Sequence, residues 1–165
     1  MRTGIFAGSF DPFTIGHQSV VRRALPLFDK IIIGVGTNTS KRCMHTPDER
    51  VEAIRRIYEG EERVEVCCYS GLTATFARER AAGYIIKGVR SAADFESERA
   101  QADINRRISG VETILLVAEP GLDSISSSVV RELASFGMDV SEYLPQLADR
   151  NKNDGDTQNI EHQNG

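Results

Sequence analysis

The chain has 165 residues, of which 40% are apolar and 27% are charged, a balance typical of one globular domain with its own core. No apolar run approaches the roughly 20 residues that a membrane-spanning helix needs. The formal net charge of −4 argues against bulk binding of nucleic acid, which depends on clustered positive charge. A small anionic ligand needs only a few well-placed lysines and arginines, so this class of ligand stays open.

Cysteine use points to a reducing compartment. The three cysteines are Cys43, Cys67 and Cys68, and an odd number with an adjacent pair does not make a disulfide framework. Their spacing does not match a zinc site either, so no structural metal is expected. The first residues lead straight into an apolar run, so no signal peptide is expected, and we expect the protein in the cytoplasm.

Short apolar runs rich in β-branched residues alternate with helix-like segments along the chain. Strands are predicted at residues 3–7, 30–36, 63–69, 84–86 and 113–118. Helices are predicted at 16–27, from 46 onward, and at 72–82, 92–108, 126–136 and 140–148. The second helix has a clear start, because Thr46 can cap it, Pro47 takes the first helical position and Glu49 completes a capping box.

The end of the chain is polar. From Asp149 onward, Ile160 is the one apolar side chain in the segment. So little apolar surface cannot offset the entropy lost on ordering a chain. The sequence therefore predicts a domain of residues 1–148 followed by a disordered polar tail at 149–165.

The alternation of strands and helices predicts an α/β fold. We expect a Rossmann-like, doubly wound sheet of five parallel strands, with helices on both faces and a C-terminal helix. Such sheets bind ligands beyond the carboxyl ends of their strands. Polar residues do follow each strand of this chain, at 9–17, 38–41, 70–73, 87–90 and 123–128. The sequence therefore predicts one site built from five loops.

The loop after the first strand is rich in functional groups. Thr14-x-Gly16-His17 runs into a helix start, where free N–H groups and the positive end of the helix dipole favour a phosphate. Ser9 adds a further hydroxyl. The chain has no G-x-x-x-x-G-K-S/T loop and no G-x-G-x-x-G after the first strand, which disfavours a P-loop kinase or a dinucleotide dehydrogenase. In the simpler alternative, Thr14 caps the helix beside an ordinary histidine.

The segment Ile125-Ser126-Ser127-Ser128 repeats this pattern near the other end of the chain, although three hydroxyls at a helix start can also be plain N-caps. Other candidates have simple alternatives too. Lys41 could be a solvated loop residue, and Arg90 could form a structural salt bridge. Glu98 could be a surface residue paired with Arg99 or Arg106. The two hydroxyl-rich helix starts and the intervening basic residues together favour a nucleotide site.

Four motifs follow one another in the chain: Gly8-Ser9-Phe10-Asp11-Pro12 with Thr14-x-Gly16-His17, then Lys87-Gly88-Val89-Arg90, Ala93-Asp94-Phe95-Glu96-x-Glu98, and Ile125-Ser126-Ser127-Ser128. With these motifs, the chain closely resembles the bacterial phosphopantetheine adenylyltransferases over residues 3 to 147. The first and last motifs alone would indicate only the wider nucleotidyltransferase superfamily.

The resemblance implies an adenylyl transfer from ATP to 4′-phosphopantetheine, which gives 3′-dephospho-coenzyme A and pyrophosphate in the penultimate step of coenzyme A synthesis. It implies in-line attack by the substrate phosphate on the α-phosphorus, without a covalent enzyme intermediate. It also implies Mg²⁺ held by ATP phosphates and water rather than by dedicated protein ligands. Finally, it implies a homohexamer and feedback binding of coenzyme A.

The resemblance also implies roles for individual residues. His17 would stabilise the transition state, with Thr14 beside it, and Lys41 and Lys87 would hold the phosphate of the acceptor. The substrate-binding set is Ser9, Lys41, Thr73 and Lys87. The ATP-binding set is Ser9, Phe10, His17, Gly88, Val89, Arg90, Glu98, Leu122, Asp123, Ser124, Ile125, Ser126, Ser127 and Ser128.

The chain departs from the family pattern at two positions. Ser9 replaces the usual threonine and keeps the hydroxyl. Lys87 replaces the usual arginine, so the charge stays but the two-pronged fork for phosphate is lost. Two other functions stay open. One is a nucleotidyltransferase with a nicotinamide mononucleotide or glycerol phosphate acceptor, and the other is a nucleotide-binding regulatory module without chemistry.

Overall fold

The computed structural model describes residues 1–37 and 43–147, and its strands and helices alternate along the chain. The strands are β1 (Thr3–Gly8), β2 (Lys30–Gly36), β3 (Val64–Tyr69), β4 (Tyr84–Val89) and β5 (Glu112–Val117). The α-helices are α1 (Ile15–Ala24), α2 (Pro47–Ile57), α3 (Thr73–Glu79), α4 (Ala92–Ser109) and α5 (Ser127–Ser135). Two short 3₁₀ helices complete the described elements, η1 (Leu25–Leu27) and η2 (Ser141–Tyr143).

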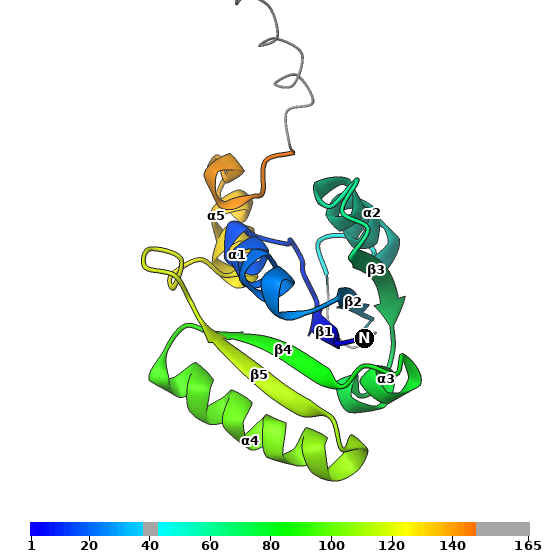
Figure 1. The fold of residues 1–165 in the computed structure, drawn as a ribbon. Helices are drawn as coiled ribbons and strands as arrows, with labels where there is room; N and C mark the ends of the chain where they lie inside the picture. Colours follow the sequence, from blue (N-terminus) through cyan, green and yellow to red (C-terminus); the bar gives the residue numbers. More distant parts are fainter. Residues whose placement is uncertain (38–42, 148–165) are drawn as a thin grey trace, which may run out of the picture.

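The five strands form one parallel sheet in the order β3-β2-β1-β4-β5 (Figure 1). This confirms the predicted Rossmann-like, doubly wound architecture. Successive strands add to one side of β1 up to β3, and the chain then crosses back to place β4 on the other side. The strand order therefore reverses between β1 and β4, which is where sheets of this kind bind their ligands.

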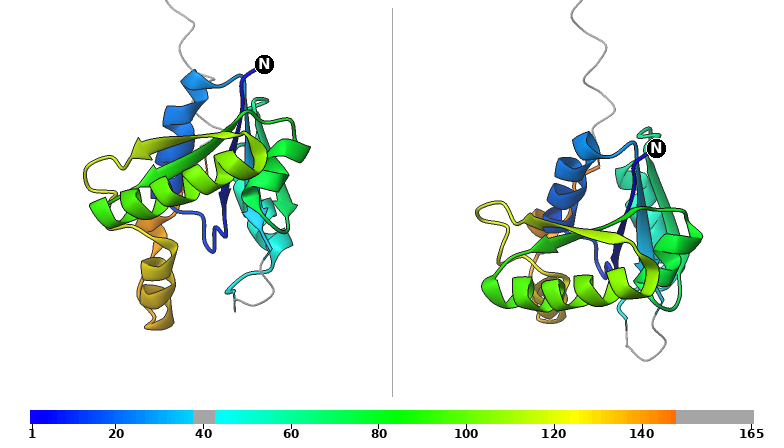
Figure 2. Two further views of the ribbon diagram at one scale, coloured as in Figure 1. Left: turned by 90° about the horizontal axis from the view of Figure 1, so that it is seen from below. Right: turned by 60° about the horizontal axis from the view of Figure 1, so that its bottom comes forward.

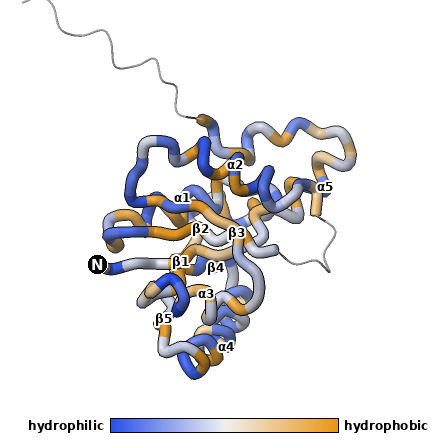
Figure 3. Tube along the Cα trace, turned by 90° about the vertical axis from the view of Figure 1, so that its right-hand side faces the viewer, coloured by the Kyte–Doolittle hydropathy of each residue, from blue (hydrophilic) through white to orange (hydrophobic). Residues whose placement is uncertain are grey.

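Helices cover both faces of the sheet, as predicted. Figures 1 and 2 show α1 and α2 on one face and α3 and α4 on the other. Neighbouring residues of β1 point to opposite faces, so Phe6 packs in the core under α1 and α2 while Ile5 packs in the core with α3. The strands at the centre are accordingly apolar, as the colouring of β1 and β2 in Figure 3 shows.

The start of α2 matches the sequence prediction. The Thr46 side chain accepts a hydrogen bond from the Glu49 N–H, and the Glu49 carboxylate accepts one from the Thr46 N–H at 2.7 Å. Pro47 occupies the first turn, where a missing N–H costs nothing. This end of α2 faces the carboxyl ends of β1 and β2, where Arg50 donates to the Ser9 and Gly36 carbonyls.

Three elements end three residues away from the prediction, namely β4, α1 and α3, and the last of these, predicted at 72–82, ends at Glu79. Strand β4 continues through Lys87 and Gly88 to Val89, because β5 pairs with it along that whole length, from Tyr84 opposite Glu112 to Val89 opposite Val117. Polar groups at the carboxyl end of a strand do not stop its pairing. The helix predicted at 16–27 ends at Ala24, and the following residues, which include Pro26, form η1.

The predicted C-terminal helix at 140–148 is wrong over its described part. The chain forms the short η2, and Leu144 then takes an extended conformation with φ −103° and ψ 143°. The reason is Pro145, whose ring disfavours helical geometry in the residue before it. Residue 148 and the tail predicted at 149–165 lie outside the described residues. No helix in the described part is long and apolar enough to cross a membrane.

Candidate active site

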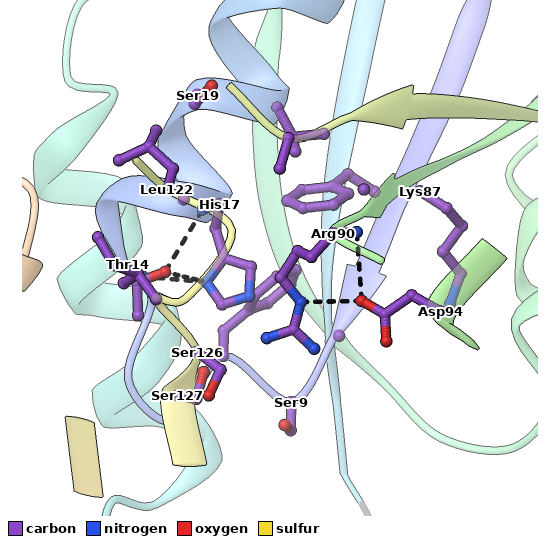
Figure 4. A pocket seen from close by; sticks show the side chains of 18 of the residues that line it. Ser9, Thr14, His17, Ser19, Lys87, Arg90, Asp94, Leu122, Ser126 and Ser127 are labelled. Atoms are coloured by element: carbon purple, nitrogen blue, oxygen red, sulfur yellow. Dashed lines mark hydrogen bonds and ion pairs between the residues drawn. The ribbon is translucent and has the colours of Figure 1, made fainter. Parts of the chain in front are cut away.

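A cavity of about 410 Å³ lies at the carboxyl edge of the sheet, where the strand order reverses between β1 and β4. Three stretches contribute most of its wall: the loop from β1 into α1, the end of β4 with the start of α4, and the segment from the end of β5 into α5 (Figure 4). Segments far apart in the sequence thus meet in one polar pocket. The prediction of a site built from five loops is confirmed only in part, because residues 70–73 after β3 do not line the cavity and residues 38–41 lie outside the described part.

Most of the predicted site residues line this cavity. They are Ser9, Phe10, Thr14, His17, Lys87, Gly88, Val89, Arg90, Glu98, Leu122, Ile125, Ser126, Ser127 and Ser128. Three predicted residues, Thr73, Asp123 and Ser124, are not among the lining residues, and Thr73 instead shares a hydrogen bond of 2.9 Å with the Tyr69 hydroxyl. Lys41 lies outside the described residues. The roles of all these residues in binding stay predictions.

Thr14 and His17 form a reciprocal cap at the start of α1. The Thr14 hydroxyl accepts from the His17 N–H at 3.4 Å, and the Thr14 N–H donates to Nδ1 of the His17 ring at 3.0 Å. A backbone N–H can only donate, so Nδ1 of the neutral ring is the acceptor and Nε2 carries the proton. Thr14 is therefore a helix cap, and the same cap fixes the tautomer of His17.

The environment of His17 keeps the ring neutral. Burial and the charge of Arg90 lower the pKa of His17 from 6.5 to about 4. In Figure 4 the imidazole lies between Thr14 and the Arg90 guanidinium. A neutral imidazole with its proton on Nε2 is a hydrogen-bond donor at every pH above about 5, which suits it to a phosphate oxygen.

The basic residues at the end of β4 and just after it are held by carboxylates of α4. The Lys87 ammonium lies 3.3 Å from a Glu98 oxygen, and the Arg90 Nε lies 2.9 Å from the Asp94 carboxylate. The alternative partners considered for Glu98 pair elsewhere: Arg99 with Glu96 and Arg106 with Glu112. An anionic ligand must therefore compete with Glu98 and Asp94 for these two cations.

Arg131 is a cavity residue that the sequence reading missed. Its guanidinium donates to the Asp11 carbonyl at 2.7 Å and to the Ser128 hydroxyl at 3.3 Å. Within the described part of the chain it has no carboxylate partner, in contrast to Lys87 and Arg90. Its spacing offered a signal, since it follows Ser127 by about one helical turn and so shares its face.

Asp11 belongs to the first motif, and the sequence alone predicts no role for it. The residue is 2% exposed, and its side chain accepts from the Met44 N–H at 2.6 Å and from the His45 N–H and ring at 3.1 Å. Burial by itself raises the pKa of Asp11, but these hydrogen bonds and the charge of Arg50 outweigh it, so the pKa lies below its usual value. The ionised carboxylate thus ties the loop after β1 to the segment before α2.

Glu119 was also missed, because nothing local in the sequence marks it. Its carboxylate accepts from the Ser19 hydroxyl and pairs with Arg22 at 2.7 Å, and these contacts lower its pKa. Both Ser19 and Glu119 line the cavity, although they are 100 residues apart. Only the folded chain brings them together.

The described residues contain no group of three or more histidine, cysteine, aspartate or glutamate side chains placed to hold a metal ion. The carboxylates of Asp94, Glu98 and Glu119 around the cavity already have cationic partners. This donor set fits a cation that arrives with a ligand of its own better than one bound by the protein alone. The predicted Mg²⁺ stays a prediction.

Comparisons with known proteins agree with this geometry. The Cytidylyltransferase-like family matches residues 5–133. A phosphopantetheine adenylyltransferase of Phocaeicola vulgatus is 51% identical over 146 residues, which cover 88% of this chain and 97% of that protein. The chain belongs to the phosphopantetheine adenylyltransferase family. Two further phosphopantetheine adenylyltransferases, of Bacteroides fragilis and Porphyromonas gingivalis, are 48% and 49% identical and cover 88% and 86% of this chain.

The fold of this family member also occurs in more distant enzymes. A crystal structure of a bifunctional NMN adenylyltransferase/ADP ribose pyrophosphatase from Francisella tularensis superposes with a TM-score of 0.65. The two share 14% identity, and the match covers 88% of this chain and 45% of that one. This likeness shows the fold alone. The resemblance drawn from the four motifs is confirmed by the curated relatives named above, which are 48% to 51% identical to this chain.

Proposed function

We propose that this phosphopantetheine adenylyltransferase family member transfers the adenylyl group of ATP to 4′-phosphopantetheine and releases pyrophosphate. The observation that carries the proposal is the cavity itself. A neutral histidine donor and three cationic side chains, those of Lys87, Arg90 and Arg131, line it together. Names of relatives up to 51% identical over nearly the whole chain support the choice of acceptor.

The chemistry needs positioning and charge stabilisation more than proton transfer. A phosphate monoester is already ionised at neutral pH, so it can attack the α-phosphorus in line without a general base. Negative charge then spreads over the oxygens around phosphorus in the transition state. A donor fixed in advance at those oxygens stabilises this state more than the ground state. His17 is suited to this role, because Thr14 fixes its ring and its Nε2 proton.

The cationic side chains of the cavity would each bind a different phosphate group of the substrates. Lys87 would hold the acceptor phosphate, together with Lys41 from the loop after β2, and Glu98 would be displaced from Lys87 as the phosphate binds. Arg131 would bind the departing pyrophosphate, since no carboxylate of the described residues neutralises it. Such charge-assisted hydrogen bonds are about twice as strong as neutral ones.

The remaining predicted residues would line the parts of the cavity that hold the adenine and the phosphates of ATP. Leu122 and Ile125 offer apolar surface for the adenine, and the hydroxyls of Ser126 to Ser128 lie at the start of α5, where a helix favours phosphate. Gly88, Val89 and Arg90 would complete the nucleotide wall. Thr73, Asp123 and Ser124 lie outside the cavity lining, so their contacts would depend on the bound substrate.

The proposal includes Mg²⁺ bound to the ATP phosphates and to water, which would neutralise charge on the leaving group. It also includes feedback by coenzyme A, because that molecule contains the whole product and would compete for the same cavity. We place the enzyme in the cytoplasm, in keeping with the unpaired thiols of Cys43, Cys67 and Cys68.

A homohexamer is part of the same proposal. Large apolar side chains on β5 and after α5 support it, since Val117, Phe136 and Met138 are 68%, 78% and 60% exposed. Exposed apolar surface of this kind is typical of subunit contacts. Light scattering after size exclusion measures the mass of the assembly directly, and a mass of one subunit would contradict the proposed homohexamer.

The experiment that tests the function measures pyrophosphate release from ATP and Mg²⁺ with three acceptors in turn. We expect release with 4′-phosphopantetheine and little with nicotinamide mononucleotide or glycerol phosphate. Release with one of the other two acceptors instead would assign a different nucleotidyltransferase. No release with any acceptor, together with tight ATP binding, would favour a regulatory module.

A further inference from the structure

Arg50 is buried in a way that charged residues rarely are. It lies on α2, is 4% exposed, and is the only buried lysine or arginine in residues 1–37 and 43–147. No carboxylate of these residues lies within ion-pair distance of it. A buried charge is costly unless its surroundings satisfy it. The sequence by itself predicts no role for this arginine.

The partners of Arg50 are backbone carbonyls from three segments. Nη1 donates to the Ser9 carbonyl and to the Gly36 carbonyl at 3.4 Å, and Nε donates to the Thr46 carbonyl at 3.3 Å. These carbonyls come from the loop after β1, the end of β2 and the cap of α2. A guanidinium can join all three because its donors form a rigid planar fork, which an ammonium lacks.

The bond to Ser9 has a consequence for the cavity. The peptide between Ser9 and Phe10 is trans, so its N–H points away from the direction of its C=O. With the Ser9 carbonyl directed at Arg50, the Phe10 N–H points to the opposite side of the peptide. No acceptor among the described residues takes that N–H, and both residues line the cavity.

The local backbone does not hold this geometry by itself. Phe10 has a φ of +47°, a left-handed conformation that costs a non-glycine residue about 1–2 kcal/mol. Such a conformation persists only where its surroundings impose it. Arg50 supplies a contact that does so, from an element 41 residues away in the sequence.

We propose that Arg50 is a positioning residue, which fixes the Ser9–Phe10 peptide so that the Phe10 N–H donates to a phosphate oxygen of the bound substrate. This inference rests on the proposed function for the identity of that substrate. Arg50 itself does not touch the reacting atoms. It acts through the peptide that it holds.

Nuclear magnetic resonance tests the inference without any turnover. The full chain carries seven phenylalanines, so labelling with ¹⁵N-phenylalanine gives few signals. We expect the Phe10 amide signal to shift when inorganic pyrophosphate is added to the native protein, and this shift to be lost in Arg50→Gln. A Phe10 signal that does not respond in the native protein, or responds equally in Arg50→Gln, overturns the inference.

Arg55→Gln is the matched control. Arg55 lies on the same helix and donates to a strand carbonyl, that of Val66 at 3.1 Å, but Val66 does not line the cavity, whereas Ser9 does. We expect Arg55→Gln to leave the Phe10 shift and kcat within about threefold of native. A loss in Arg55→Gln as large as in Arg50→Gln would show a general effect of α2 and would overturn the inference.

Steady-state kinetics give a second measurement, because a change in folding stability alone does not lower the kcat of the folded enzyme. We expect Arg50→Gln to lower kcat on the order of 10²-fold with the KM for ATP little changed, because small misplacements of a positioned group cost about that much. Arg50→Lys keeps the charge but loses the fork, and should lose about tenfold. If Arg50→Gln does not fold, Arg50→Lys decides, and native kcat in Arg50→Lys overturns the inference.

These measurements also separate the inference from the proposed function. A native protein that releases no pyrophosphate with phosphopantetheine contradicts the function, while the Phe10 shift still decides the role of Arg50. Native turnover with undiminished kcat in Arg50→Gln contradicts the role of Arg50 alone.

Discussion

The Thr14–His17 cap leaves Nε2 of the imidazole as the proton-bearing nitrogen beside the cavity. If this donor acts on the transition state, His17→Ala should lower kcat on the order of 10²–10³-fold, as loss of other preorganised donors does. Steady-state pyrophosphate release checks this, with ATP binding measured in parallel. An unchanged kcat with only KM raised would show that His17 serves binding alone.

His17 should also titrate far from the usual histidine range. Burial and Arg90 lower its pKa to about 4, so the ring should stay neutral down to about pH 5. Because the unfolded chain takes up this proton near pH 6.5, the stability that His17 contributes is lost as pH falls from there towards 4. The ring signals of selectively labelled histidine report the titration directly. A midpoint near 6.5 would contradict this environment.

Lys87 pairs with Glu98 in the structure, and the phosphate of a bound substrate would compete with Glu98 for it. Lys87→Ala should raise the KM for phosphopantetheine and lower kcat, each by roughly tenfold or more, because a charge-assisted bond is lost. Lys87→Arg should be nearly neutral. Lys30→Ala is the control, since Lys30 pairs with Glu65 at 2.7 Å and does not line the cavity. Unchanged turnover in Lys87→Ala would remove Lys87 from the site.

At the scale of elements, α2 links local sequence to the site. Its capping box is encoded by Thr46 and Glu49, and the helix that it starts carries Arg50 into the core. Thr46→Ala should lower the free energy of unfolding by about 1 kcal/mol, because it leaves the Glu49 N–H without its acceptor. Urea denaturation measures this. Glu52→Ala on the exposed side of the same helix should change it by less than about 0.5 kcal/mol.

At the scale of the molecule, the packing of the two faces sets which side chains the sheet tolerates. A Cβ on Gly34 in β2 would lie 2.8 Å from the Phe76 ring and 3.1 Å from Tyr69, which stack on each other with ring centroids 4.4 Å apart. Gly34→Ala should therefore destabilise the fold by about 1–3 kcal/mol through overpacking. Thermal unfolding checks this. Gly83→Ala is the control, since a Cβ there meets no atom within 4 Å, and equal losses would contradict the packing argument.

Much of the architecture could be predicted because it depends on local patterns. The apolar runs of the strands, the cap at Thr46 and the order of the motifs are visible in the sequence, and the resulting strand–helix alternation allows few topologies. The helix predicted at 140–148 is wrong over residues 140–147, because Pro145 sterically disfavours helical geometry at Leu144.

The sequence by itself determined the family and the loops that make the site, because family motifs and the carboxyl ends of strands are both readable along the chain. Only the tertiary structure decided which groups hold each other there. It pairs Lys87 with Glu98, and it directs Arg50 to the Ser9 carbonyl and Ser127 to the Pro12 carbonyl at 2.8 Å. The physical reason is distance along the chain. Ser127 and Pro12 are 115 residues apart, and no local propensity reports a hydrogen bond that only folding creates.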